Sequence, residues 1–424
     1  MNETLRIQRL DEIRNTKPYT SMEVLYFGRK QQLPVHPIPL DVLIYNKYNG
    51  RIASMIKSYE RQYRELDASN NADEEIIEQF LWDSNPTRNK HTLEDLARGQ
   101  LRYGIVTRDG VIIDGNRRAF LLGKIAEDQK ELPGIFYAVI LEDTLDGNPK
   151  EIMRLETTYQ MGEDEKLGYN AIEKYLRCKD LIKEGFKVPE IAKMMSEDDE
   201  LIEKWLRTMT LMDSYLDSLA YDGIYTRLDG TEGLFVDLEL YLQKYRKGTE
   251  LATWAYSDSD VSDLQTIFYD LIRARFSGDG KMYRWAGRPS KKESFFCNQD
   301  VWKQFADFHF ENVEPLTNTE RSIDELRKEN PDGNLDELLR QRDQDWEANV
   351  IPKIKQNFGQ CVRRLEDFNA KSAPIELLRR ALSTLQTIDT TADAFLNDPN
   401  VEEAVGQINS LTYEFKKIIK HKGR

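Results

Sequence analysis

The chain has few of the residues that build disulfide scaffolds or metal centres. Its 424 residues include only three cysteines, which lie far apart, at Cys178, Cys297 and Cys361. This odd and scattered set excludes a disulfide framework and matches no zinc-ligand spacing. The four histidines are equally scattered, at His36, His91, His309 and His421. Such sparse cysteine use is typical of a reducing compartment, so we expect a cytoplasmic protein.

Long apolar runs are also missing. No stretch of about eighteen apolar residues occurs, which excludes a membrane-spanning helix. The first six residues are polar and lack the apolar core of a signal peptide. The net charge of −14 argues against a protein that coats nucleic acid over its whole surface. A local basic patch is compatible with that charge, because attraction depends on the face presented.

The length of 424 residues predicts two or three domains. Short β-rich runs alternate with helical segments in the first part, and the strand signal fades after about Pro149. We therefore predict an α+β fold, in which a small mixed-sheet domain precedes a helix–turn–helix and a largely helical C-terminal region. The predicted parts are an N-terminal arm at 1–34, the mixed-sheet domain at 35–149, the helix–turn–helix unit at 150–222 and the helical region at 223–424.

The segment from Ile105 to Arg118 is the most informative in the chain. Two β-branched runs flank Asp109-Gly110, a pair that accepts the positive φ angles of a tight turn, so we predict a β-hairpin. The second run stops at Asp114, and a helical stretch from about Ala119 to Ile125 follows. Between them, at a helix N-terminus, stand Gly115, Asn116, Arg117 and Arg118. Exposed backbone N–H groups favour anions there, and arginine binds phosphate through two parallel hydrogen bonds.

The order of elements around this segment resembles the ParB/sulfiredoxin superfamily. A predicted strand at Ile38–Ile44 precedes Asn49-Gly50-Arg51, and a short helix at Leu93–Gln100 leads into the hairpin. Residues 115–118 take the place of the family's Gly-Glu-Arg-Arg box. The segment Ile152–Thr157 looks like the helix that carries the family's Glu-Asn motif. The resemblance covers roughly residues 35 to 220.

This resemblance implies a site for a nucleoside triphosphate, ATP or CTP, with Mg²⁺. The phosphates would be contacted by Gly115, Arg117 and Arg118, and Arg51 would be a further anion contact. Asn116 would face the substrate. The resemblance makes Glu156 the candidate catalytic carboxylate, which would hold the magnesium ion or orient water. The alternative is that these residues have no role in binding or catalysis. The arginines would then be solvated side chains at the end of a hairpin, and Glu156 would lie on an exposed helix face.

Two departures from the family pattern reduce the number of reactions that we expect of this chain. Asn116 stands where sulfiredoxin has its cysteine, so we do not expect sulfinic-acid reduction. Partition proteins have a glutamate at that position, and an amide cannot act as a carboxylate. Glu156 is followed by Thr157 rather than asparagine. Both differences speak against hydrolysis by the partition mechanism more than against phosphate binding.

Two segments are candidates for binding nucleic acid. A helix–turn–helix is predicted from a short helix at Val188–Met195 and a second at Leu201–Met212. Four acidic residues, 197–200, precede the second helix and would repel phosphate, so we expect a packing unit rather than sequence-specific recognition. The better candidate is the segment 281–292, which interleaves aromatic residues with Lys281, Arg284, Arg288, Lys291 and Lys292. Such a loop can follow a phosphate backbone and stack on bases. The alternative is a surface loop anchored by buried aromatic residues.

The C-terminal half shows helical patterns but no motif that indicates a catalytic or binding site. Apolar residues recur at helical spacing in 335–350 and 375–388, as expected for a bundle core or for the contact of a homodimer. The cations from Lys416 to Arg424 are most simply a solvated basic tail.

These observations together favour a ParB-like protein that couples nucleoside triphosphate binding, with or without slow hydrolysis, to association with DNA or a protein partner. Partition, mobile-element and genome-defence settings fit equally well. Two alternatives remain open: a metal-dependent nuclease or phosphotransferase of the same fold, and a non-catalytic interaction module with a vestigial pocket.

Overall fold

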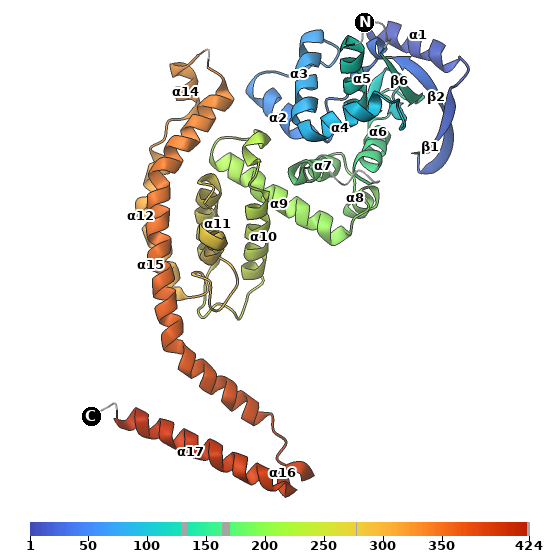
Figure 1. Ribbon diagram of the computed structural model, residues 1–424. Coiled ribbons are helices and arrows are strands. Elements are labelled where there is room, and N and C mark those ends of the chain that lie inside the picture. Colours follow the sequence, from blue (N-terminus) through green and yellow to red (C-terminus); the bar gives the residue numbers. More distant parts are fainter. Residues whose placement is uncertain (129–133, 163–169, 277, 332, 422–424) are drawn as a thin grey trace. The chain divides into compact units, whose positions relative to one another are not determined.

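The computed structural model describes residues 1–128, 134–162, 170–276, 278–331 and 333–421 (Figure 1). The chain forms two compact units, Met1–Asn357 and Phe358–Arg424. None of the described helices has both the length and the apolar content needed to cross a membrane. The predicted α+β fold class is confirmed, because a mixed sheet at the N-terminus is followed by a mostly helical region.

The sheet has six strands in the order β1-β2-β6-β4-β5-β3. Three strand pairs are antiparallel, β1 with β2, β2 with β6 and β4 with β5, whereas β4 with β6 and β3 with β5 are parallel. The strand bounds are β1 Thr20–Tyr26, β2 Arg29–Pro39, β3 Ile44–Tyr45, β4 Gly104–Val106, β5 Val111–Asp114 and β6 Ile135–Ile140. The hairpin predicted around Asp109-Gly110 is therefore β4–β5.

Both faces of the sheet are buried. Successive strand residues point to opposite faces, so Ile112 joins one apolar cluster while Val111 and Ile113 join the other. The first cluster is covered by helices α1 to α5, and the second is covered by α6. The bounds of these helices are α1 Glu3–Arg14, α2 Ala53–Gln62, α3 Asn71–Asp83, α4 Pro86–Leu96, α5 Asn116–Asp128 and α6 Pro149–Thr157.

The prediction of an arm at 1–34 is wrong. These residues form α1, β1 and half of β2, and they belong to the sheet domain. Helix α1 buries Leu10 completely and packs the partly buried Ile13 against the same cluster. It is also tied by a polar contact, because the Nε of Arg6 donates to the backbone oxygen of Asp109 over 2.6 Å.

The predicted strand at Ile38–Ile44 is also interrupted. Strand β2 ends at Pro39, a 3₁₀ turn spans Leu40–Val42, and Ile44 begins β3 on the opposite edge of the sheet. The chain thus crosses from β2 to the edge beside β5, and this crossing carries residues 46–51 toward the start of α5.

The helix–turn–helix elements are present with longer bounds than predicted. Helix α8 spans Val188–Met195 as expected, and α9 spans Asp199–Ser218 rather than 201–212. They follow a π-helical turn at Thr158–Gly162 and α7 at Ala171–Lys183. Residues 163–169 of the predicted helix–turn–helix unit lie outside the described residues. The compact units do not separate at residues 149 or 222, because α2 of the sheet domain packs against α7.

The remainder of the first unit is helical. Its elements are the 3₁₀ segment Tyr225–Leu228, α10 Glu232–Arg246, α11 Asp258–Arg273, the 3₁₀ segment Asp279–Ala286, α12 Gln299–Asn312, α13 Glu314–Asn318, α14 Ile323–Glu329 and the first part of α15, which spans Leu335–Gln386. Leu335, Leu339 and Val350 are buried, so the amphipathic stretch predicted at 335–350 packs into the core.

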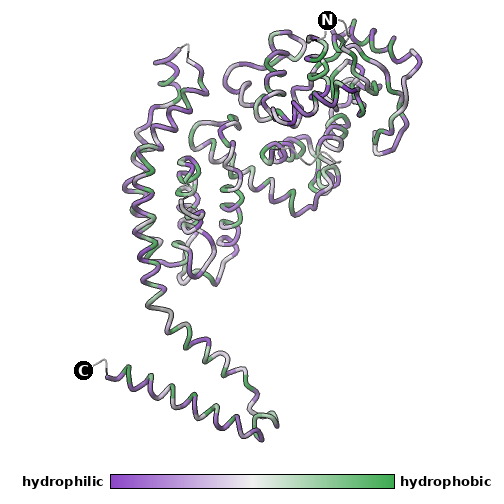
Figure 2. Tube along the Cα trace, viewed as in Figure 1, coloured by the Kyte–Doolittle hydropathy of each residue, from purple (hydrophilic) through white to green (hydrophobic). Residues whose placement is uncertain are grey.

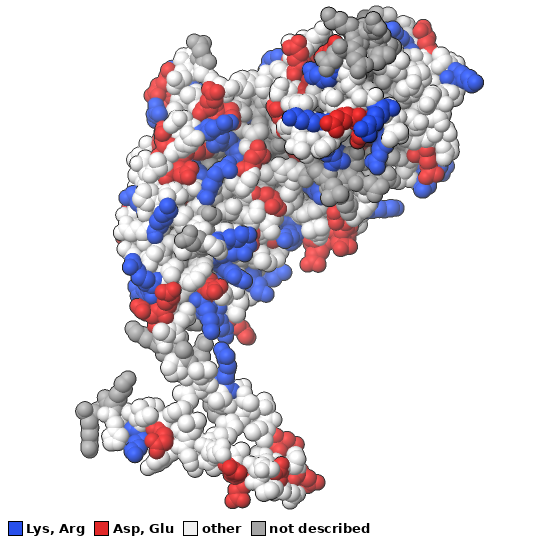
Figure 3. Space-filling model, in the orientation of Figure 1, with Lys and Arg blue, Asp and Glu red and all other residues white. Residues whose placement is uncertain are grey.

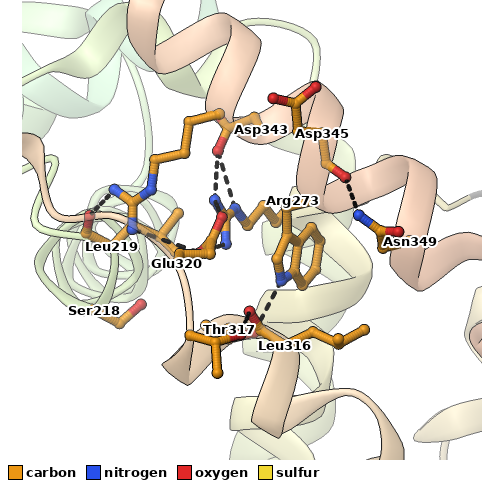
Figure 4. A network of polar contacts seen from close by, with 12 residues as sticks. Ser218, Leu219, Arg273, Leu316, Thr317, Glu320, Asp343, Asp345 and Asn349 are labelled. Carbon is orange, nitrogen blue, oxygen red and sulfur yellow. Dashed lines mark hydrogen bonds and ion pairs between the residues drawn. The ribbon is translucent and has the colours of Figure 1, made fainter. Parts of the chain in front are cut away.

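A buried group of charges joins α11 to α15 (Figure 4). The Arg273 side chain is only 1% exposed. Its guanidinium donates to Asp343 over 2.9 Å and to Glu320 over 2.6 and 2.8 Å. The ring of Trp346 lies 4.4 Å from the guanidinium carbon. These carboxylates raise the pKa of Arg273, so it stays charged despite its burial.

The second unit contains the rest of α15, α16 Asp393–Asn397 and α17 Pro399–His421. The lysines expected in a basic tail are part of α17, while Lys422, Gly423 and Arg424 lie outside the described residues. No described residue of α17 is buried.

Candidate functional site

The junction between β5 and α5 can be built only with glycine at position 115. Gly115 has a φ of +106°, and a Cβ there would lie 2.6 Å from the Cζ of Phe136, a fully buried residue of β6. Both the left-handed backbone and the close aromatic ring exclude a side chain. Strand β5 can therefore end at Asp114 and α5 can begin at Asn116 with a single residue between them.

Five arginine side chains line one cavity beside this junction. The cavity has a volume of about 330 Å³ and also includes Gly115, Asn116 and two acidic residues, Asp95 and Asp114. Its arginines come from the segment before α2, from α4, from the segment before β4 and from the first turn of α5; they are Arg51, Arg88, Arg102, Arg117 and Arg118. All five residues predicted to bind a nucleotide thus lie at one cavity. With five cations against two anions, the wall carries an excess of positive charge.

The two arginines of α5 are held differently. Arg117 is 8% exposed, and its guanidinium donates to the Oγ of Ser84 over 3.3 Å. Arg118 pairs with Asp114 at 2.6 Å, on the preceding strand end. The Nε of Arg118 is buried, and no described residue accepts its hydrogen bond. Arg118 therefore retains hydrogen-bonding capacity that its ion pair does not use.

Two of the five arginines, Arg88 and Arg102, were not predicted from the sequence. Helix α4 begins at Pro86, well before the predicted start at Leu93, and the side chain of Asn85 caps it by accepting from the N–H of Arg88 over 3.0 Å. An asparagine followed by proline is a recognisable helix start. That signal would have extended the helix back to Arg88. It would not have placed Arg88 beside α5, because that depends on the packing of α4 against α5.

Asn116 does not present its side chain to a ligand, contrary to the expectation from the resemblance. It is 2% exposed. Its Oδ1 accepts from the backbone N–H of Asn46 over 2.8 Å, and its Nδ2 donates to the backbone oxygen of Ile112 over 2.8 Å. Both groups of the amide are thus used to fasten the start of α5 to β5 and to the segment after β3.

Glu156 does not lie at the arginine-lined cavity. It is 3% exposed on α6, where its Oε2 accepts from Arg177 over 2.8 Å and its Oε1 accepts from the Nδ2 of Asn46 over 3.1 Å. Burial raises the pKa of Glu156, and the Arg177 guanidinium opposes that shift. It lines a second cavity of about 400 Å³ with Asn46 and Arg177.

The predicted role of Glu156 in holding magnesium or orienting water stays a prediction, and in the structure the partners of its carboxylate are protein donors. Both of its oxygens already accept hydrogen bonds from the protein. Within the described ranges, no group of three histidine, cysteine, aspartate or glutamate residues is arranged to hold a metal ion. A chain of hydrogen bonds links α7 to α5, in the order Arg177, Glu156, Asn46, Asn116, and its last step uses the backbone N–H of Asn46. Sequence reasoning missed Arg177 and Asn46, because neither belongs to a motif.

The basic loop at 281–292 is only partly as predicted. Of the two aromatic residues in the segment, Tyr283 is 5% exposed and cannot stack on bases, whereas Trp285 is half-buried; Phe295 and Phe296, which follow the segment, are fully buried. Arg284 is also occupied, because its Nε donates to Asp237 over 2.9 Å. The exposed cations are Lys281, Arg288, Lys291 and Lys292. Basic and acidic side chains are interspersed on the face seen in Figure 3.

No protein-family model matches this chain, and no curated protein matches it in sequence. The candidate site therefore rests on the positions and chemistry of its own residues.

Proposed function

We propose that this chain is a ParB-like protein that holds the phosphates of a nucleoside triphosphate, ATP or CTP, in the arginine-lined cavity. The observation that carries the proposal is the convergence of five arginines on one cavity at the N-terminus of α5. A triphosphate concentrates several negative charges in a short chain, and arginine pairs with phosphate through two hydrogen bonds. A cavity of about 330 Å³ is within the usual size range of ligand sites.

The helix itself supports the same ligand. The first N–H groups of α5 have no partner within the helix, and they carry the positive end of the helix dipole. Arg117 and Arg118 stand in that first turn, so backbone and side-chain donors belong to one site. Phosphate binding, rather than hydrolysis, is the activity that we propose, since Glu156 is engaged by Asn46 and Arg177.

Nucleotide binding would control the association of this cytoplasmic protein with DNA or with a protein partner. The exposed cations Lys281, Arg288, Lys291 and Lys292 provide contacts for a phosphate backbone, without base stacking by the buried rings. A partition, mobile-element or genome-defence role is equally compatible with such coupling. No observation in the described part of the chain favours a metal-dependent nuclease.

Isothermal titration calorimetry tests the nucleotide proposal. ATP, CTP, GTP and UTP are titrated into the full chain, with and without Mg²⁺. We expect at least one of them to bind, and Arg117→Ala with Arg118→Ala to abolish the heat. Arg98→Ala is the matched control, because Arg98 is exposed just after α4 and does not line the cavity. Affinity for none of the four nucleotides, or unchanged affinity in the double variant, contradicts the proposal.

Binding of a fluorescent DNA duplex tests the second part of the proposal. Fluorescence anisotropy is measured over a range of salt concentrations, with and without the nucleotide that binds. Lys291→Glu with Lys292→Glu should weaken binding and reduce its salt dependence, because fewer phosphate contacts release fewer counterions. Lys90→Glu serves as the control, since Lys90 is an exposed cation of α4. Equal affinities for the two charge-reversed proteins would exclude this loop as the DNA contact.

A further inference from the structure

Helix α7 buries two charged side chains. It carries hydrophobic residues among hydrophilic ones (Figure 2), and Ile172, Leu176 and Leu181 belong to its buried face. Glu173 is buried with them at 3% exposure, and so is Arg177 at 5%. Buried charges are rare unless they are paired or hydrogen-bonded. Since Glu173 and Arg177 are one helical turn apart, they lie on one face of α7, and both have partners outside the helix.

Glu173 takes the place of a capping residue for α2. The residue before this helix, Ile52, has no polar side-chain atom and makes no capping hydrogen bond. A capping side chain usually accepts from the second or third N–H of a helix. In α2 the second N–H is that of Ser54, and it lies 3.2 Å from both carboxylate oxygens of Glu173. The Oγ of Ser54 donates to the same carboxylate over 2.5 Å. The start of α2 is thus capped by a residue 119 positions further along the chain.

Arg51 lies immediately before this capped turn. Its backbone N–H donates to the Oδ1 of Asn49 over 2.9 Å, and both residues line the arginine-lined cavity. The next N–H, that of Ile52, donates to the backbone oxygen of Asn49 over 3.1 Å, and the oxygen of Ile52 accepts from the N–H of Ile56 in α2 over 2.9 Å. The turn that carries Arg51 therefore continues directly into the first turn of α2. A shift of that first turn would move Arg51 as well.

The other end of the same segment is also connected to α7. Arg177 donates to the Oε2 of Glu156 over 2.8 Å, and the Oε1 of Glu156 accepts from the Nδ2 of Asn46 over 3.1 Å. Asn46 begins the segment 46–54, which carries Arg51. Helix α7 thus holds this segment at both ends, directly at one end and through Glu156 at the other.

We propose that Glu173 is a positioning residue for the arginine-lined cavity: by capping α2 it holds Arg51 where its guanidinium contacts the phosphates of the nucleotide. This inference rests on the proposed nucleotide binding. Side chains that bind a ligand need support from buried hydrogen bonds behind them, because a group already in place binds without a further cost of ordering. Glu173 is not among the described residues that line the cavity, so it acts through Arg51. Its own negative charge opposes the binding of an anion, so position and charge predict effects of opposite sign.

Calorimetric titration of the full chain with ATP, CTP, GTP and UTP tests this proposal. Glu173→Ala should weaken binding by on the order of tenfold, and Arg51→Ala should weaken it by a similar factor. The two losses should not add in the double variant, since an alanine at position 51 leaves no guanidinium for the cap to position. Glu173→Gln should restore most of the affinity, because its amide oxygen can still accept from Ser54.

The matched control is Asp180→Ala. Asp180 of α7 pairs with Lys57 of α2 over 2.9 Å, so this variant removes a contact between the same two helices. It leaves the first turn of α2 capped, and its affinity for the nucleotide should equal that of the wild type. A loss of affinity as large as that in Glu173→Ala would show that any contact between α7 and α2 has this effect, and it would overturn the specific role of Glu173.

The outcomes separate this inference from the proposed function. A wild-type chain that binds none of the four nucleotides contradicts both. A wild-type chain that binds, together with unchanged or tighter binding in Glu173→Ala, unchanged binding in Arg51→Ala, or additive losses in the double variant, overturns the positioning role alone.

Hydrogen exchange followed by mass spectrometry gives a second measurement that needs no nucleotide. In Glu173→Ala the amides at the start of α2 should exchange faster than in the wild type, whereas those of α3 should be unchanged. Unchanged exchange at the start of α2 overturns the proposal. Fast exchange throughout the chain also overturns it, because Glu173 would then support the whole fold rather than the cap of one helix.

Discussion

The backbone N–H of Asn46 donates a 2.8 Å hydrogen bond to the Oδ1 of Asn116, seventy positions further along the chain. This contact fixes the first residue of α5 to the segment that leads to Arg51. The side-chain Nδ2 of Asn116 in turn donates to the backbone oxygen of Ile112. The position of the arginine-lined cavity therefore depends on one buried side chain that need not touch a ligand itself.

Replacement of Asn116 by alanine should destabilise the protein. Two buried hydrogen bonds are lost, and two backbone groups are left without partners, which costs about 1–3 kcal/mol. Urea unfolding followed by circular dichroism measures the change. Asn318→Ala, at the exposed end of α13, should leave the free energy of unfolding unchanged. Equal stabilities of the two variants would show that the Asn116 bonds contribute nothing net.

Removal of the Asp114 carboxylate should strengthen nucleotide binding. Asp114 lines the cavity and pairs with Arg118 at 2.6 Å, so it both repels phosphate and occupies one cation. Loss of one nearby negative charge changes the interaction with an anion by about 1 kcal/mol in a solvent-exposed site. We expect Asp114→Asn to tighten binding by roughly fivefold, measured by calorimetry. Asp41→Asn, outside the cavity, should have no effect. A weaker Asp114→Asn complex would mean that Asp114 serves chiefly to orient Arg118.

The stability of the protein should depend on the titration of Glu173. This residue is 3% exposed on α7, and its carboxylate accepts from the Oγ of Ser54 over 2.5 Å. Burial raises the pKa of Glu173 from 4.5 to about 7. Since the folded state holds the proton more tightly, this contribution is fully present below pH 4.5 and is lost as the pH rises through about 7. The shift corresponds to about 3 kcal/mol.

Glu173→Gln isolates this contribution. The variant keeps an oxygen for Ser54 and removes the titration, so its free energy of unfolding should fall less between pH 5 and pH 8 than that of the wild type. Urea unfolding at several pH values measures both curves. If the free energy of unfolding changes with pH equally in the wild type and in Glu173→Gln, other groups cause the pH dependence.

The ion pairs of Arg273 should contribute far more to stability than those on the surface. Arg273→Met leaves Glu320 and Asp343 partly buried without their main cation, which should cost about 3–5 kcal/mol. Arg321→Ala removes an exposed pair with Glu329 and should cost about 1 kcal/mol or less. Thermal and urea unfolding of the two variants give the comparison. If Arg273→Met lowers the free energy of unfolding no more than Arg321→Ala does, the buried ion pairs do not contribute more to stability than the exposed pair.

The parts that local sequence fixes were predictable. Asp109-Gly110 determines the hairpin turn, and the alternation of β5 residues between two buried faces requires the apolar run that was seen in the sequence. Gly115 marks the passage from strand to helix for a local reason as well. Such features depend only on neighbouring residues, so the sequence of the segment is enough to predict them.

The parts that depend on distant contacts were not predictable. Arg88 reaches the cavity only because α4 packs on α5, and the role of Asn116 depends on Asn46. Glu156 was assigned to catalysis by analogy, whereas its partner Arg177 lies on another helix. The attachment of α1 to the sheet domain was not predictable either, because it depends on contacts such as that of Arg6 with the hairpin turn, about one hundred positions away.

The aromatic ring beneath Gly115 has a further consequence for how a ligand would be received. Phe136 belongs to β6, a strand that pairs on both sides, with β2 and with β4, and its side chain is fully buried. The part of the cavity wall formed by Gly115 is thus backed by the sheet. A preformed wall spares a ligand much of the entropic cost of ordering the protein. Recognition at this site should therefore be fast and close to rigid-body, with selectivity set by the shape of the cavity.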